Sequence, residues 1–166
     1  LQDGIVRNGP DLPQIHVAVG AKIGLATRYA AAGIVDKAKA EAKRTLEYLM
    51  PFVERGISIV GLEPSCLLTL RDEFLQYGYG QQAVALSKAS FLFEEFLVKE
   101  QEAGRLKLEL KALETPRVLL HGHCHQKALG VMSSIEKTLS QLPDTEVEVV
   151  ETSCCGMAGS FGYGTD

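Results

Sequence analysis

The sequence lacks several features that would place it in a common class of protein at once. It has no long apolar run: the least polar stretch, residues 17–35, contains Lys22 and Arg28 and does not span a membrane. It has no basic excess, since 17 lysines and arginines stand against 21 acidic residues, so nucleic acid is not expected as a partner. No secretory signal is recognisable, and no low-complexity segment interrupts the chain.

Cysteine is scarce as well, with only Cys66, Cys124, Cys154 and Cys155 in 166 residues. So few cysteines in a chain of this length do not indicate a disulfide scaffold. They favour a reducing compartment, where grouped cysteines more often bind metal or take part in redox chemistry. We therefore expect a cytoplasmic protein, at most peripheral at the inner membrane through its partners. A start without Met, at Leu1, and a stop at Asp166 indicate a piece of a longer protein.

Short apolar runs alternate with helical patterns along the chain. Strands are predicted at 15–19, 57–60, 117–121 and 146–150, and helices at 35–53, 64–75, 82–102 and 124–139. Residues 105–116 indicate a surface linker, and residues 20–33 show no clear pattern. This alternation predicts an α/β fold with a mainly parallel sheet flanked by helices.

Every cysteine follows one of the predicted strands within a few residues. Ligands of open parallel sheets bind beyond the carboxyl ends of the strands. The sequence therefore predicts that all four cysteines lie at the same edge of the same sheet. Cys66 and Cys124 also lie near predicted helix starts, where the helix dipole favours a thiolate.

Four converging thiolates would bind an iron–sulfur cluster or zinc. Zinc sites usually draw on short C-x-x-C loops, and the chain has none. The adjacent pair Cys154-Cys155 favours a cluster, because neighbouring thiolates can reach different irons. Gly156 and Gly159 follow in a loop that lets the backbone approach a bound group closely. The alternative is that the pair consists of two small buried residues at a strand end.

The polar residues near the cysteines allow two interpretations each. His123 and His125 could bind metal or carry protons, but hydrogen bonding around the ligands or helix capping is favoured. Glu63 could be a hard ligand or a turn residue, and the turn is favoured. His16, on a predicted strand, is expected to be structural.

Three motifs in order carry a resemblance to a known family. They are Gly61-Leu62-Glu63-Pro64-Ser65-Cys66, His121-Gly122-His123-Cys124-His125 and the run from Ser153-Cys154-Cys155-Gly156 to Gly162. Together they resemble the cysteine-rich CCG domain that occurs in heterodisulfide reductase and in the iron–sulfur subunit of glycolate oxidase. The chain is most similar to the C-terminal part of large FAD-linked oxidases of the D-lactate and D-2-hydroxyglutarate dehydrogenase type. The resemblance covers about residues 32–163.

The resemblance implies a domain of two related halves, each able to carry a set of cluster-binding cysteines. It predicts an N-terminal segment of uncertain structure with one short strand (1–31) and a CCG-type domain (32–166). The first half of that domain extends to about residue 104, and a truncated second half covers 117–166. Cys66 matches the last cysteine of the first half, whereas Cys124 and the Cys154-Cys155 pair match the opening of the second half. The first-half pair would fall near residues 24–28, where no cysteine stands, so that half is expected to be degenerate.

The function that this resemblance implies is electron transfer. An iron–sulfur cluster, of the 4Fe-4S kind, would be bound by Cys66, Cys124, Cys154 and Cys155. It would serve an FAD-linked oxidoreductase acting on a 2-hydroxy acid such as D-lactate, glycolate or 2-hydroxyglutarate. FAD would sit on another domain or subunit, partnered by a ferredoxin-like Fe–S module, and this chain alone would not be catalytic. The alternatives are thiol/disulfide chemistry like that of heterodisulfide reductase, and a zinc-binding or metal-free module that docks subunits.

Overall fold

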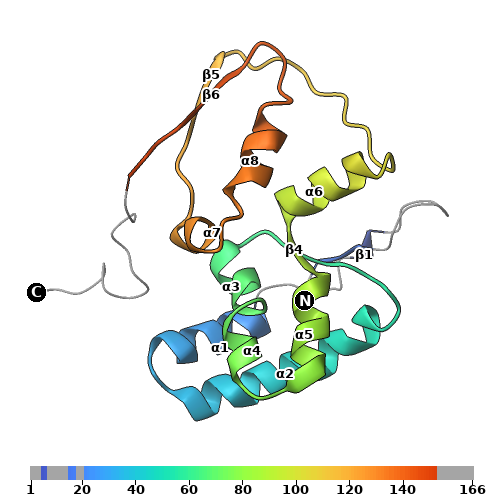
Figure 1. The fold of residues 1–166 in the computed structure, drawn as a ribbon, viewed down its shortest axis with the longest axis vertical. Coiled ribbons are helices and arrows are strands. Elements are labelled where there is room, and N and C mark those ends of the chain that lie inside the picture. Colours follow the sequence, from blue (N-terminus) through green and yellow to red (C-terminus); the bar gives the residue numbers. More distant parts are fainter. Residues whose placement is uncertain (1–4, 7–14, 18–20, 153–166) are drawn as a thin grey trace, which may run out of the picture. The chain divides into compact units, whose positions relative to one another are not determined.

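The computed structural model describes residues 5–6, 15–17 and 21–152. Cys154, Cys155, Gly156 and Gly159 therefore lie outside the described residues. The chain divides into two compact units, Leu1–Phe93 and Glu94–Asp166 (Figure 1). The domain boundaries predicted at residues 31 and 104 stay predictions.

Unit 1 is built on a four-stranded sheet in the order β1-β2-β3-β4. Its strands are β1 (Ile5–Val6), β2 (Ile15–Val17), β3 (Ile59–Gly61) and β4 (Ser90–Leu92). β1 is antiparallel to β2, whereas β2, β3 and β4 are parallel. The inner strand β3 is buried along its whole length, which explains its continuous apolar sequence.

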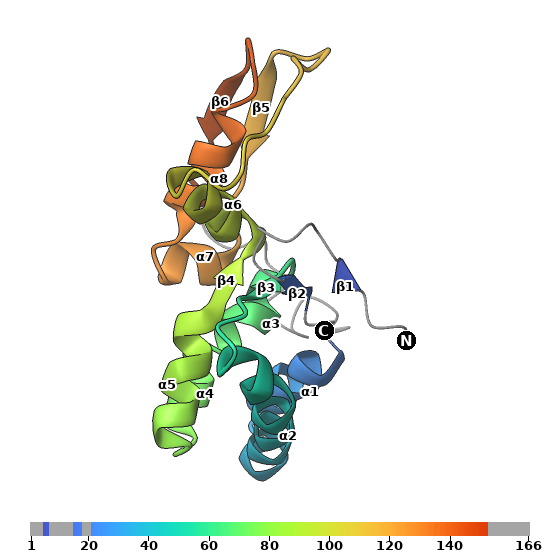
Figure 2. The same ribbon diagram turned by 90° about the vertical axis from the view of Figure 1, so that its right-hand side faces the viewer.

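The helices described in unit 1 are α1 (Ala21–Ala31), α2 (Val35–Val53), α3 (Pro64–Thr69), α4 (Glu73–Gln76) and α5 (Gly80–Ala89). α1 packs against both α2 and α3, and α2 also packs against α5. Figure 2 shows α1 and α2 side by side. The apolar stripe of α2 supplies Leu46 and Leu49 to a core that also contains Phe74 and Leu86, all of them fully buried.

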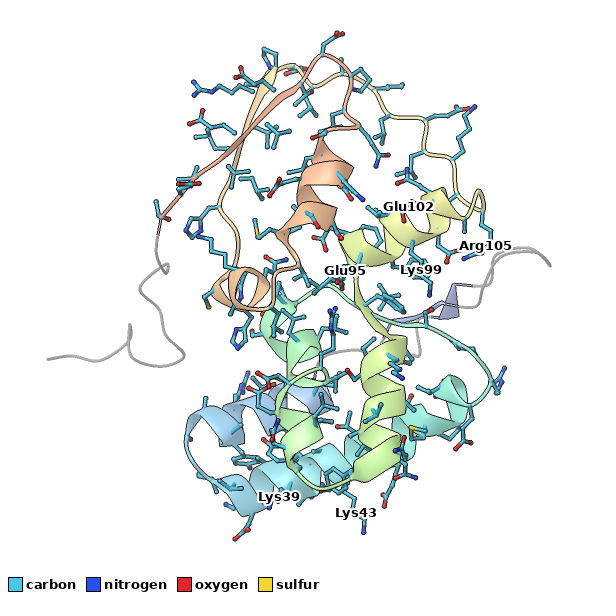
Figure 3. The ribbon with its side chains drawn as sticks, viewed as in Figure 1. Lys39, Lys43, Glu95, Lys99, Glu102 and Arg105 are labelled. Carbon is cyan, nitrogen blue, oxygen red and sulfur yellow. The ribbon has the colours of Figure 1, made fainter. Side chains whose placement is uncertain are left out.

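Unit 2 contains a two-stranded parallel sheet of β5 (Arg117–Leu120) and β6 (Glu146–Val149). Its helices are α6 (Phe93–Glu102, from the last residue of unit 1), α7 (Cys124–Ala128) and α8 (Met132–Leu139). Residues 105–116 form neither helix nor strand, so the predicted linker is confirmed. Figure 3 labels Glu102 on α6 and Arg105 just beyond the end of this helix. The guanidinium of Arg105 forms a bidentate ion pair with the buried carboxylate of Glu100, with Nε 2.7 Å from Oε2 and Nη2 2.8 Å from Oε1.

The predicted fold class is confirmed, because short parallel strands alternate with helices in both units. The expectation that all four cysteines lie at one edge of one sheet is wrong. Cys66 follows β3, in the four-stranded sheet, whereas Cys124 follows β5, in the two-stranded sheet. The alternation of strands and helices along a sequence does not show which strands pair with each other. The prediction of a single sheet therefore had no support from that alternation.

The predicted helix at 82–102 is interrupted by β4. Ser90, Phe91 and Leu92 pair in parallel with β3, and the Ser90 hydroxyl donates to the Leu86 carbonyl oxygen at the end of α5. The predicted helices at 64–75 and 124–139 are each broken into two as well. Residues 20–33, which show no clear sequence pattern, contain α1, whose Ile23 and Ala26 are buried.

Candidate metal centre

Cys66 lies in the first turn of α3, and Glu63 caps that helix. The Glu63 carboxylate accepts hydrogen bonds from the backbone N–H groups of Ser65 (3.2 Å) and Cys66 (2.6 Å), and also from the Ser65 hydroxyl. Pro64 occupies the first helical position, where its missing N–H costs nothing. The sequence Glu-Pro-Ser-Cys thus forms a capped helix start, and the turn role expected for Glu63 is confirmed.

This arrangement sets the protonation of both side chains. Burial would raise the pKa of Glu63, but hydrogen bonds from Cys66 and Ser65 outweigh it and lower the pKa to about 2. Burial, together with the hydrogen bond to Glu63 and the negative charge of that carboxylate, raises the pKa of the Cys66 thiol to about 12. The expectation of a favoured thiolate at Cys66 is therefore wrong. The free N–H groups of the helix start are taken by a carboxylate, whose charge lies beside the sulfur.

Helix α1 lies next to the Cys66 thiol. A Cβ atom placed on Gly24 would be 3.5 Å from Sγ of Cys66. The Thr27 hydroxyl forms a 3.1 Å hydrogen bond with the Thr69 hydroxyl. Thr27 and the charge of Arg28 both lower the pKa of Cys66, but the effects of burial and Glu63, which raise it, are larger. Nothing in the residues alone indicated these neighbours, since they lie about 40 positions earlier in the sequence.

The same stretch, residues 24–28, is where the resemblance placed the missing first-half cysteine pair. The structure brings it to Cys66, but with glycine, threonine and arginine in place of thiols. Cys66 is the one cysteine of residues 1–93. Iron–sulfur clusters are held by several thiolates, and the neighbours of Cys66 supply a carboxylate in place of further thiols. The assignment of Cys66 as a cluster ligand stays a prediction.

Cys124 opens α7, four residues after β5, and it is exposed. His123 caps this helix: its Nδ1 accepts the backbone N–H of His125 at 3.2 Å. In return, Oε1 of Gln126 accepts the backbone N–H of His123 at 3.0 Å, which completes a capping box. The helix-capping interpretation of His123 is confirmed.

The two imidazole rings flank the Cys124 thiol. Sγ of Cys124 lies 3.8 Å from Nδ1 of His123 and 3.9 Å from Nδ1 of His125. The rings stack with their centroids 5.4 Å apart. Among the described residues, these three form a group whose possible ligand atoms all lie within 4.8 Å of one another.

The chain that leads toward Cys154 is held near α7. β6 runs parallel to β5, and the pairing continues beyond its end through the Val150 N–H, which donates to the Leu120 carbonyl oxygen at 2.8 Å. Two residues later, Nζ of Lys127 on α7 donates to the carbonyl oxygen of Thr152 at 2.8 Å. Cys154 is only two residues beyond Thr152, a chain length of at most about 7 Å. No pattern in the sequence indicated this role for Lys127.

Comparison with known proteins identifies related dehydrogenases. The chain is 26% identical over 163 residues to a subunit of the anaerobic glycerol-3-phosphate dehydrogenase of Escherichia coli, an alignment that covers 93% of the chain and 40% of that protein. It is 26% identical to D-2-hydroxyglutarate dehydrogenase of E. coli (79% of the chain, 12% of that protein) and 27% identical to that of Haemophilus influenzae (79% and 13%). The chain thus spans less than half the length of these relatives, and it is related to parts of oxidoreductases.

No family model matches the chain, and no solved structure matches it significantly. Within the part of the chain that the structure describes, no helix combines the length and apolar character needed to cross a bilayer.

Proposed function

We propose that this chain is an electron-transfer part of an FAD-linked oxidoreductase. It would bind an iron–sulfur cluster through Cys124 together with Cys154 and Cys155. A bound cluster accepts and passes on single electrons. The chain's own contribution is to hold the thiolates and to surround them with N–H groups. Its similarity to segments of two kinds of dehydrogenase supports this class of function.

One structural observation carries the proposal: the hydrogen bond from Lys127 to Thr152. This hydrogen bond holds Thr152, which lies two residues before the cysteine pair in the sequence, against α7, the short helix that begins at Cys124. In the sequence, Cys124 comes four residues after β5 and Cys154 five residues after β6, which supports a shared site for three of the four cysteines. The exposed Cys124 thiol is open to an incoming group.

The surroundings of Cys66 argue against thiol/disulfide chemistry at that residue. An attacking thiol must be a thiolate, and a pKa of about 12 keeps Cys66 protonated at neutral pH. The same argument weakens the case for Cys66 as a cluster ligand, which stays a prediction. We expect the cluster to depend on the three cysteines of unit 2.

The substrate and partners of the whole enzyme belong to the proposal too. A 2-hydroxy acid such as 2-hydroxyglutarate, D-lactate or glycolate is the favoured substrate class, since two of the relatives are D-2-hydroxyglutarate dehydrogenases. FAD would be bound by a separate domain or subunit, with a ferredoxin-like Fe–S module between the flavin and this chain. The similarity to an anaerobic glycerol-3-phosphate dehydrogenase makes glycerol 3-phosphate the second candidate.

The test is anaerobic reconstitution of the purified chain with iron and sulfide, followed by visible absorption and EPR. A brown, reducible product is expected, which Cys124→Ser and Cys155→Ser should abolish. Cys66→Ser is the matched control and should keep most of its iron. A colourless product from the unchanged chain, or equal iron in all variants, would rule out the proposed ligands.

A further inference from the structure

The atoms around Cys124 already approximate a small metal site. In a tetrahedral zinc site, bonds of about 2.3 Å to sulfur and about 2.1 Å to nitrogen place these ligand atoms about 3.5 Å apart. The observed distances from Sγ of Cys124 to Nδ1 of His123 and of His125 are 3.8 and 3.9 Å. The possible ligand atoms of all three residues lie within 4.8 Å of one another, so rotation of the two imidazole side chains would bring the three donors into coordination distance of a single ion.

We propose that His123, Cys124 and His125 bind a divalent first-row metal ion of the zinc type, without help from Cys154 or Cys155. One thiolate and two imidazoles are a donor set that suits Zn²⁺ and Co²⁺. Cys124 is exposed and both histidines are half-buried, so an ion can enter from solvent. The fourth coordination position is left for water or an added ligand.

Binding at Nδ1 of His123 changes the start of α7 in a defined way. That nitrogen now accepts the backbone N–H of His125, and a metal ion would replace this hydrogen bond. The other half of the capping box, from the His123 N–H to Gln126, does not involve the imidazole and can persist. Asparagine at position 123 could still cap the helix but would supply no imidazole, so it separates the two roles.

The ion would also control the proposed function, and this consequence rests on that function. Cys124 has one thiolate, so a chain with zinc on His123, Cys124 and His125 would be a poor acceptor for a cluster that needs the same sulfur. Zinc would then hold the chain in a state unable to carry electrons.

The experiment is a titration of the reduced, metal-free full chain with Co²⁺ under anaerobic conditions. We expect one Co²⁺ ion per chain, a thiolate-to-cobalt charge-transfer band in the near ultraviolet, and visible absorption bands as intense as those of tetrahedral Co²⁺. Addition of Zn²⁺ should displace the cobalt and remove these bands. Cys124→Ser should remove the charge-transfer band, and His123→Asn and His125→Asn should each weaken binding tenfold or more. The Cys154→Ser/Cys155→Ser double variant should bind as the unchanged chain does.

His121→Asn is the matched control, because His121 is exposed, lies two residues before His123 and is not in the group of three. Far-ultraviolet circular dichroism of each variant separates loss of ligand from loss of fold. Cobalt binding that survives both histidine changes but needs Cys154 and Cys155 would overturn the proposal, as would the absence of a charge-transfer band. Iron–sulfur reconstitution is read on separate samples, so either proposal can fail without the other.

Discussion

At the scale of single residues, the two described cysteines have opposite surroundings. Cys66 is partly buried and hydrogen-bonded to a carboxylate, whereas Cys124 is exposed between two imidazoles. Both stand at the start of a short helix with a side-chain cap, Glu63 in one case and His123 in the other. The difference between the sites therefore comes first from burial and then from the chemistry of the capping residue. Burial and the carboxylate cap together raise the pKa of the Cys66 thiol, whereas the imidazole cap places a nitrogen donor beside Cys124.

Replacing Glu63 by glutamine should make Cys66 more reactive. The change removes the negative charge beside Sγ, so the pKa of Cys66 falls, although burial keeps it above the usual value for cysteine. The thiolate fraction below the pKa rises about tenfold for every unit by which the pKa falls. Peptide-resolved mass spectrometry of iodoacetamide labelling, followed across pH, measures this change. Cys124 in the same sample is the internal control, and an unchanged labelling profile at Cys66 would refute the role of Glu63.

Glu63 should also make the free energy of unfolding depend on pH in the acidic range. Its folded-state pKa of about 2 lies below the ordinary value of 4.5, so its contribution is complete above pH 4.5 and is lost as the pH falls toward 2. Because the side chain is largely in contact with solvent, the contribution should be near that of a helix cap, about 1 kcal/mol. Urea unfolding between pH 6 and pH 3 should show a shallower loss for Glu63→Gln than for the unchanged chain. Glu109→Gln, in the exposed linker, should leave the slope as it is.

Close approach of the backbone at Gly61 is a second residue-scale constraint. A Cβ atom at this position would lie 2.7 Å from Cδ1 and 2.9 Å from Cβ of the buried Leu67. Gly61→Ala should therefore destabilise the fold by about 1–3 kcal/mol, as overpacking does. Gly24→Ala is the matched comparison: its Cβ would meet Sγ of Cys66 at an ordinary 3.5 Å, inside helix α1. Equal urea midpoints for the two variants would contradict this reasoning.

At the scale of elements, β4 shows how tertiary pairing overrides a local pattern. Residues 82–102 have helical spacing, yet Ser90, Phe91 and Leu92 extend and pair with β3. Leu92 becomes one of the best-buried side chains, at 1% exposure, while Phe93 directly after it is 44% exposed. One step along the chain thus separates a core residue from a surface residue.

Leu92→Ala should cost about 2–5 kcal/mol, because it leaves a cavity behind a strand in the core of unit 1. Phe93→Ala removes a larger side chain but should cost no more than about 1 kcal/mol. Chemical denaturation of both variants measures the contrast. Equal losses of stability in the two variants would contradict the burial contrast between Leu92 and Phe93.

The elements that could be predicted from the sequence are those with a strong local signal. The apolar stripe of α2 and the short apolar or alternating runs of β2, β3, β5 and β6 give such a signal, and Glu63 and His123 could be expected at helix starts. α1 is rich in alanine and carries little periodicity, so its sequence gives no clear helix signal. No local pattern indicated the neighbours of Cys66, since Thr27 reaches Thr69 only through the packing of α1 on α3; the family resemblance alone pointed to residues 24–28. The link from Lys127 to Thr152 likewise depends on how β6 pairs with β5.

At the scale of the whole molecule, the two units differ in what they can bind. Residues 1–93 contain a single cysteine, and residues 94–166 contain three. The resemblance to a two-halved domain would allow one cluster per half. Residues 24–28 hold no cysteine and Cys66 is the one thiol of unit 1, so we expect the chain as a whole to carry one redox centre.

Iron and acid-labile sulfide per chain provide the corresponding measurement. A fully reconstituted chain should contain about four iron atoms if the cluster is of the 4Fe-4S kind. Removal of the cluster by a chelator under oxidising conditions should release all of this iron in one kinetic phase. About eight iron atoms, or a second phase that disappears in Cys66→Ser, would show that unit 1 holds a centre of its own.

The junction of β4 and α6 has a practical consequence for taking the protein apart. Leu92 ends the strand and Phe93 begins the helix, so no loop residue stands between them, and the boundary of the two units falls directly after Phe93. Proteases cut extended, accessible chain, and residues 105–116 offer it while the junction does not. Among the described residues, cleavage is therefore expected in that linker, which leaves α6 attached to the N-terminal piece, so the two fragments will not coincide with the two compact units.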